Sequence, residues 1–197
     1  MKRVLCFGDS NTYGYDPRSL LGGRYPKNVR WTGRLMTFGF VVVNEGQNGR
    51  EIPTRDGEVL SAINMIQNAQ PLDVIVIMLG GNDLLQHPSF TAEDVTARME
   101  RFLCELRSHV SDCCYLLVAP PPMQWGEWVM EQRLIDESAR LSACYHSLAR
   151  SLRIDYADAG RWNIKLAFDG VHFSEAGHAA FADGLLRCLS EKGCQQK

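Results

Sequence analysis

The sequence of 197 residues lacks several features that mark whole classes of protein. No apolar run approaches the roughly 20 residues of a membrane-spanning helix, and the short run near the N-terminus is no signal-peptide core. Positive and negative charges are nearly balanced, with 21 Lys and Arg residues and 23 Asp and Glu residues, and the basic residues form no stripe along the sequence. We therefore expect no membrane and no nucleic acid as partner.

Paired cysteine motifs are missing too. The seven cysteines are odd in number and irregularly spaced, and the sequence contains no C-x-x-C pair. This pattern favours reduced, mostly buried thiols over a disulfide framework or a zinc site. We therefore expect a cytoplasmic protein with no metal, and no motif calls for a cofactor.

Two well-known active-site motifs are also absent. Without G-x-S-x-G, the chain has no nucleophile elbow of the α/β-hydrolase kind. Residues 8–14 are rich in small residues but lack the lysine of G-x-x-x-x-G-K-[ST] and the spacing of G-x-G-x-x-G. Phosphate binding at that segment is therefore disfavoured.

The sequence does contain short apolar runs that alternate with amphipathic segments along its whole length. The apolar runs are typical of buried parallel strands, and the amphipathic segments are typical of helices. The predicted strands cover residues 4–7, 40–44, 73–79, 114–118 and 154–157, and residues 11–29 form a predicted loop. The predicted helices cover residues 30–37, 56–69, 91–109, 131–151 and 174–189.

This alternation predicts an α/β fold in one domain over residues 1–197. We expect three α/β/α layers around a flavodoxin-like, five-stranded parallel sheet of order 2-1-3-4-5. Ligands bind such sheets at the carboxyl ends of the strands. Residues 8–10, 46–49 and 80–83 follow three neighbouring strands, so the sequence predicts that they converge there.

Ser10 follows the first predicted strand directly, in the turn Gly8-Asp9-Ser10. A serine hydroxyl becomes a nucleophile only when a base takes its proton and a third group orients that base. Of the five histidines, His172 is the best candidate, because it lies in a turn before the last predicted helix. Asp169 precedes it by three residues, and Gly170 permits the bend that brings the carboxylate to the imidazole.

Ester cleavage also needs hydrogen-bond donors aimed at the developing oxyanion. The candidates are the backbone N–H of Ser10, the backbone N–H of Gly49 and the side-chain amide of Asn82. Glycine lets a ligand oxygen approach the main chain closely, and an amide donates without titrating. Either residue could instead serve only to form a turn.

Four blocks in chain order resemble the SGNH (GDSL) hydrolase family. They are Gly8-Asp9-Ser10, the glycine of Asn48-Gly49, Gly80-x-Asn82-Asp83 and Asp169-x-x-His172. The resemblance implies a three-layer fold, no metal or cofactor, and a serine esterase mechanism. It implies that Ser10 is the nucleophile, His172 the base and Asp169 its orienter, with an oxyanion hole of Ser10, Gly49 and Asn82.

Residues 3–10, 29–33 and 76–80 are similar to the arylesterase/acyltransferase branch of that family. The chain departs from the commonest family pattern at Asn11, where leucine is usual, and at Gly81, where threonine is frequent. Neither position carries a catalytic role in the family. The expected activity is hydrolysis of small acetyl-type esters, with acyl transfer to alcohols as an extension.

Two other functions stay open at this point. Trp125, Trp128 and Trp162 could line a sugar platform, which would make the protein a carbohydrate O-acetylesterase. A non-catalytic, flavodoxin-like binding module is the alternative from a different class. The expected partner is a small ester substrate, and a homo-oligomer is left open.

Overall fold

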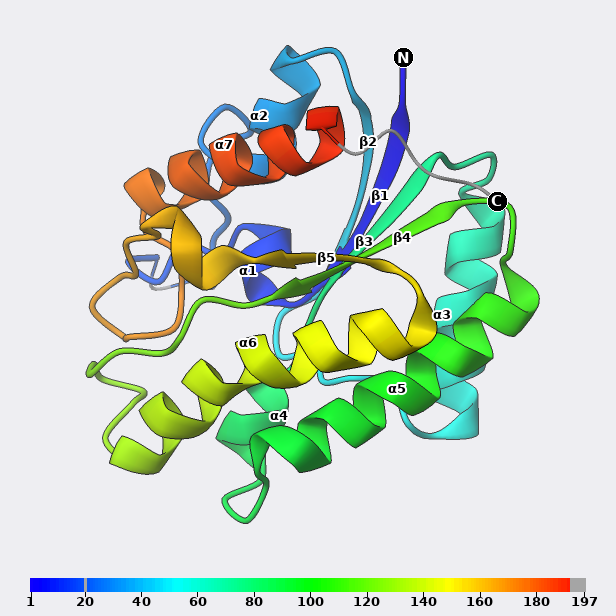
Figure 1. The fold of residues 1–197 in the computed structure, drawn as a ribbon. Helices are drawn as coiled ribbons and strands as arrows, with labels where there is room; N and C mark the ends of the chain where they lie inside the picture. The colour runs from blue at the N-terminus through cyan, green and yellow to red at the C-terminus, as the bar shows by residue number, and fades with distance from the viewer. Residues whose placement is uncertain (20, 192–197) are drawn as a thin grey trace.

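The computed structural model describes residues 1–19 and 21–191 (Figure 1). The strands of the described residues are β1 (Arg3–Gly8), β2 (Val41–Gly46), β3 (Val74–Met78), β4 (Cys114–Ala119) and β5 (Asp155–Asp158). The helices are α1 (Ser10–Tyr13), α2 (Trp31–Thr37), α3 (Asp56–Asn68), α4 (Gly81–Gln86), α5 (Ala92–His109), α6 (Gln132–Leu152), α7 (Glu175–Glu191) and the 3-10 helix η1 (Ala159–Trp162).

The strands form one parallel sheet in the order β2-β1-β3-β4-β5, which confirms the predicted topology. Helices α2 and α7 cover one face of the sheet, and α3, α5 and α6 cover the other (Figure 1). The described residues therefore form the three-layer α/β/α fold that the sequence predicts.

Alternate residues of the central strands supply the two cores. Leu5 and Phe7 of β1 face the layer of α3, α5 and α6, where Ile75 and Ile77 of β3 join them. Val4, Cys6, Val74, Val76 and Met78 pack instead against the layer of α2 and α7. Strands buried on both faces are continuously apolar, which is why these runs are visible in the sequence.

The predicted loop at residues 11–29 is wrong at its start, because Ser10–Tyr13 forms the short helix α1. The Asp9 carboxylate accepts the backbone N–H of Asn11 and caps this helix, and Gly14 ends it with a φ of 89°. Helix α4 was not predicted either. Both follow strand ends closely and, with four and six residues, are too short to show a helical period in the sequence.

The cysteines differ in part from the expected reduced thiols. Cys6, Cys104, Cys113 and Cys144 are free, but Cys114 is disulfide-bonded. Spacing alone could not reveal a pairing outside the usual motifs. In the part of the chain that is described, no helix has both the length and the apolar content of a membrane span.

Candidate functional site

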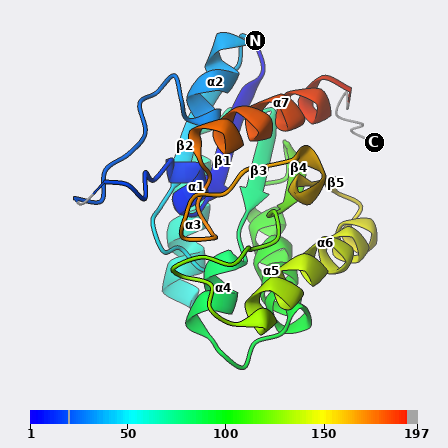
Figure 2. The ribbon, with the colours of Figure 1, turned by 90° about the vertical axis from the view of Figure 1, so that its left-hand side faces the viewer.

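The site lies at the carboxyl edge of the sheet, where α1 and the loops after β2, β3 and β4 meet the segment before α7. Figure 2 looks onto this edge. Ser10 is the first residue of α1 and directly follows the Asp9 cap. The turn needs glycine at position 8, because a Cβ there would lie 2.1 Å from Thr12 Oγ1 and 2.9 Å from the Met78 carbonyl oxygen.

Asp169 and His172 lie in the segment before α7, as the sequence predicts for a tight turn. Asp169 Oδ1 accepts the backbone N–H groups of Val171 and His172, each at 2.9 Å. Asp169 Oδ2 lies 2.6 Å from His172 Nδ1. Gly170 adopts a φ of 81°, and a Cβ there would lie 2.0 Å from the Gln124 carbonyl oxygen. The turn therefore folds the carboxylate onto the imidazole ring.

The structure brings the three predicted residues together. His172 Nε2 lies 2.9 Å from Ser10 Oγ, although the two residues are 162 positions apart in the chain. The exposed fractions of Ser10, His172 and Asp169 are 6%, 2% and 0%. A continuous chain of hydrogen bonds thus runs from a buried carboxylate through an imidazole to a hydroxyl at the edge of the site.

Hydrogen bonds decide the protonation state of the Asp169 carboxyl group. Burial by itself raises the pKa of Asp169, but the His172 side chain and the backbone N–H groups of His172 and Val171 outweigh it and lower that pKa. Asp169 is therefore ionised near neutral pH. An ionised acceptor on Nδ1 orients the ring so that Nε2 faces Ser10 as a proton acceptor.

Asn11 ties the two halves of the site together. Its Nδ2 donates to the Val171 carbonyl at 3.2 Å, and its Oδ1 accepts the Phe173 N–H at 2.8 Å. The amide therefore holds the backbone on both sides of His172. Sequence reasoning gave Asn11 no role. The available signal was its position next to Ser10, where an amide replaces the usual leucine of the family pattern.

Asn82 lies in α4, and its side-chain Nδ2 donates to the Arg50 carbonyl at 3.0 Å. An amide carries two N–H groups, so a second donor is available. Gly49 has a φ of 71°, and no described residue beyond its chain neighbours lies within 4 Å of where its Cβ would stand. Gln86 Nε2 donates to the Gly49 carbonyl at 3.2 Å. Asn82 and the Gly49 segment are therefore joined, at the ends of β3 and β2.

A small cavity of about 20 Å³ lies beside Ser10. That volume is little more than the roughly 10–15 Å³ that a single water molecule needs. The cavity is lined by Asp9, Ser10, Asn11, Gly81, Asn82, Pro120, Pro121, Met123, Ser138 and Val171. Burial raises the pKa of Asp9 in this wall to about 6, although the Asn11 N–H opposes the shift.

Aromatic side chains surround His172. The ring centroids of Tyr15 and Trp128 lie 4.7 and 4.9 Å from that of His172. Trp125, Trp128 and Phe168 are each at least half exposed. The loop that carries the two tryptophans is held by backbone bonds from Gln124 N to Gly170 O and from Trp128 N to Asp169 O. Within the described residues, no group of His, Cys, Asp and Glu side chains could hold a metal ion.

Comparison with known proteins adds to this geometry. Comparison with curated protein sequences finds no match. Among solved structures, the M. smegmatis aryl esterase is similar, with 26% identity, a TM-score of 0.87, and 97% of this chain and 99% of that chain covered.

Two structures from Sinorhizobium meliloti are similar as well. A carbohydrate acetylesterase has 25% identity and a TM-score of 0.84, with 97% of this chain and 99% of that chain covered. A carbohydrate acetylesterase family member has 28% identity and a TM-score of 0.83, with 98% and 100% covered. The model of the GDSL-like lipase/acylhydrolase family matches residues 6–180. The chain therefore belongs to the GDSL-like lipase/acylhydrolase family.

Proposed function

We propose that this protein is a serine esterase that hydrolyses small, acetyl-type carboxylic esters through an acyl-enzyme intermediate. The observation that carries the proposal is the chain of hydrogen bonds from Asp169 through His172 to Ser10, with separations of 2.6 and 2.9 Å. Family membership and the similarity to esterase structures support it.

In the first half of the reaction, Ser10 Oγ attacks the ester carbonyl while His172 Nε2 takes the hydroxyl proton. Asp169 accepts a hydrogen bond from His172 Nδ1–H throughout and stabilises the imidazolium. The negative oxygen of the tetrahedral intermediate is bound by the N–H groups of Ser10 and Gly49 and by the Asn82 amide. The carbon–oxygen bond to the alcohol then breaks, and the leaving alcohol takes the proton from His172.

In the second half, water attacks the acyl group on Ser10, and His172 removes the proton of that water. The carboxylic acid leaves when the Ser10–acyl bond breaks and the hydroxyl regains its proton. A second alcohol in place of water gives acyl transfer by the same steps. Trp128 is half exposed and lies beside His172, where such an acceptor alcohol could approach.

The size of the cavity beside Ser10 argues for a short acyl group. A volume of about 20 Å³, close to that needed by one water molecule, favours a methyl group over a longer chain. Met123 lines the cavity and is 5% exposed. We expect Met123→Ala to raise the ratio of butanoate to acetate kcat/KM by about tenfold, since pocket methylenes are worth roughly 10–200-fold.

The matched control is Met130→Ala, because the Met130 side chain is 78% exposed and does not line the cavity. It should leave the butanoate-to-acetate ratio unchanged. Equal ratios in Met123→Ala and the wild type would show that this cavity does not receive the acyl group.

A carbohydrate O-acetylesterase is the second candidate, and the exposed Trp125 and Trp128 favour it. Their exposed fractions are 62% and 50%, so a large part of each side chain is available to contact a sugar. If the alcohol portion is a sugar, acetylated xylo-oligosaccharides should be cleaved with a higher kcat/KM than aryl acetates. Replacing Trp125 by alanine should then raise KM for the sugar ester alone.

The proposed function is tested by Ser10→Ala with p-nitrophenyl acetate as substrate. Turnover should fall to background while circular dichroism and the melting temperature stay near wild type, since the change removes one oxygen atom. Wild-type turnover in a folded Ser10→Ala variant would show that Ser10 is not the nucleophile.

A further inference from the structure

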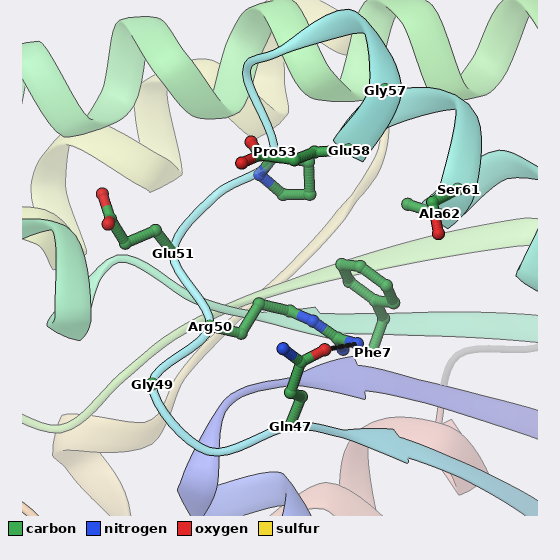
Figure 3. A pocket seen from close by; sticks show the side chains of 10 residues that line it. All are labelled: Phe7, Gln47, Gly49, Arg50, Glu51, Pro53, Gly57, Glu58, Ser61 and Ala62. Atoms are coloured by element: carbon green, nitrogen blue, oxygen red, sulfur yellow. Dashed lines mark hydrogen bonds between the residues drawn. The ribbon is translucent and has the colours of Figure 1, made fainter.

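The segment from Gly49 to Thr54 is held by charged side chains on both of its sides. Figure 3 shows the Arg50 and Glu51 side chains leaving the backbone in opposite directions. Arg50 points toward Phe7, and Glu51 points away from it. The two residues follow Gly49 directly, so whatever holds them also fixes the peptide groups near Gly49.

The Arg50 side is anchored to the strand ends. Arg50 Nη1 donates to the carbonyls of Gly8, at 3.0 Å, and of Glu45. Its Nη2 donates to Gln47 Oε1 at 3.1 Å, and the guanidinium lies 4.2 Å from the centroid of the Phe7 ring. This side chain joins the ends of β1 and β2 beneath the segment.

The Glu51 side is anchored to Arg98 of α5. Arg98 Nη2 lies 3.2 Å from Glu51 Oε2 and donates to the Ile52 carbonyl at 3.2 Å. Arg98 Nε lies 3.1 Å from Asp83 Oδ1, an ion pair whose angle departs from that of a good hydrogen bond. Asp83 Oδ2 accepts the Ile52 N–H at 3.1 Å. Arg98 and Asp83 thus bind the backbone carbonyl and the backbone N–H of Ile52, respectively.

The same cluster reaches the Asn82 amide. Asp83 follows Asn82 in α4, and the Asp83 side chain is 0% exposed. Asn82 Nδ2 donates to the Arg50 carbonyl, two residues before Ile52. His87, at the end of α4, adds a 2.7 Å contact from its Nε2 to Glu51 Oε2. Both ends of α4 are therefore tied to the segment that contains Gly49.

We propose that Arg98 is a positioning residue for the oxyanion donors of the esterase. By pairing with Asp83 and Glu51 and binding the Ile52 carbonyl, it fixes the Gly49 segment against α4. The Gly49 N–H and the Asn82 amide then keep one arrangement toward the substrate oxygen. This proposal rests on the proposed function, because it assigns Arg98 to the same site.

The expected effect follows from the cost of a misplaced donor. Loss of one oxyanion donor lowers kcat by about 10²–10³-fold, and a displacement of about 1 Å costs up to about 10²-fold. Arg98→Met should therefore lower kcat by about 10–100-fold. KM should change by less than about threefold, since the donors act mainly on the transition state.

The test is a double-mutant cycle between Arg98→Met and Asn82→Ala, measured with p-nitrophenyl acetate. If Arg98 positions both donors, Arg98→Met should lower kcat by a clearly smaller factor in the Asn82→Ala background, where only the Gly49 N–H is left to displace, than in the wild-type background. The matched control is Arg101→Met, an exposed arginine on the same helix, which should leave kcat at the wild-type value. A full multiplicative loss in both backgrounds would overturn the proposal.

A second variant covers the case in which Arg98→Met does not fold. Glu51→Gln removes one charge of the cluster at a side chain that is 26% exposed, while Asp83 still pairs with Arg98. It should lower kcat by a smaller factor than Arg98→Met, and that factor should be smaller again in the Asn82→Ala background. An equal loss in both backgrounds, or no loss in either, would overturn the proposal.

Failure of the positioning role is distinct from failure of the esterase proposal. An inactive Ser10→Ala variant together with wild-type kcat in Arg98→Met removes only the role of Arg98. An active Ser10→Ala variant removes Ser10 as the nucleophile, and with it the serine esterase mechanism on which the role of Arg98 rests.

Discussion

Two buried histidines lie six residues apart and have opposite surroundings. His172 is 2% exposed, with Nδ1 on the Asp169 carboxylate and Nε2 on Ser10 Oγ. His178 of α7 is 0% exposed, and its Nδ1 accepts the Trp31 N–H at a long 3.5 Å. Among residues 1–19 and 21–191, its Nε2 has no hydrogen-bond partner, and the rings of Tyr25 and Phe173 pack against the imidazole.

The difference shows what makes a buried imidazole useful as a base. Burial, and next the positive charge of Arg30, lower the pKa of His178 to about 3, so this ring stays neutral. His172 is buried to the same extent, but Asp169 provides an acceptor that stabilises the imidazolium when a proton arrives. Partners on both nitrogens, rather than burial, distinguish the proposed base from a core histidine.

The largest expected effect comes from replacing each of the two histidines in turn. His172→Gln should lower kcat for p-nitrophenyl acetate by about 10³-fold or more, because Ser10 loses its proton acceptor. His178→Phe keeps a ring between Tyr25 and Phe173 and should leave kcat within about threefold of wild type. Similar losses in both folded variants would break the distinction between the two histidines.

A smaller effect is expected when the support of His172 is removed. Asn11→Leu, which restores the commoner family residue, leaves the Phe173 N–H and the Val171 carbonyl without their side-chain partner. We expect kcat to fall by about tenfold through displacement of His172, with KM little changed. Asn11→Asp keeps an acceptor for the Phe173 N–H but has no donor for the Val171 carbonyl. Its kcat should therefore lie between those of the wild type and Asn11→Leu.

Steady-state kinetics and thermal melts of the three proteins check this expectation. Equal kcat values in wild type and Asn11→Leu would mean that the turn holding Asp169 positions His172 without Asn11.

The smallest effect concerns stability rather than activity. The pKa of His178 falls from 6.5 in the unfolded chain to about 3 in the folded protein. The unfolded chain therefore binds the extra proton first, so the contribution of His178 is complete above about pH 6.5 and is lost as pH falls toward 3. One proton changes the free energy of unfolding by at most about 1.4 kcal/mol per pH unit.

Chemical denaturation of wild type and His178→Phe at pH 7, 6, 5 and 4 measures this contribution. Subtracting the free energy of unfolding of the wild type from that of the variant cancels the contributions of the other titrating groups. This difference should grow in favour of the variant as the pH falls. A difference that is independent of pH would show that His178 titrates normally in the folded protein.

The sheet order was predictable because each buried strand is a local apolar run and right-handed crossovers leave few arrangements. Ser10, Gly49 and Asn82 were placed at one edge by the same rule. The pairing of Asp169 with His172 was accessible because the two residues are only three positions apart, with Gly170 between them. These features depend on short stretches of sequence.

Other features depend on contacts between distant segments. Arg98 is one arginine on an amphipathic helix, and its pairing with Asp83 and Glu51 appears only when α5, α4 and the loop after β2 are in place. Asn11 meets residues 171 and 173 across 160 positions or more. No spacing rule marks such pairs.

The most direct test of the central claim is the intact mass of the protein after treatment with an organophosphonate ester probe. The proposed site predicts addition of one phosphonyl group to wild type, located on Ser10 by peptide mapping. Labelling should be absent in Ser10→Ala, much slower in His172→Gln, and close to wild type in His178→Phe. An unlabelled wild-type protein would contradict the serine esterase and favour the non-catalytic binding module. A label that persists in Ser10→Ala would contradict Ser10 as the nucleophile.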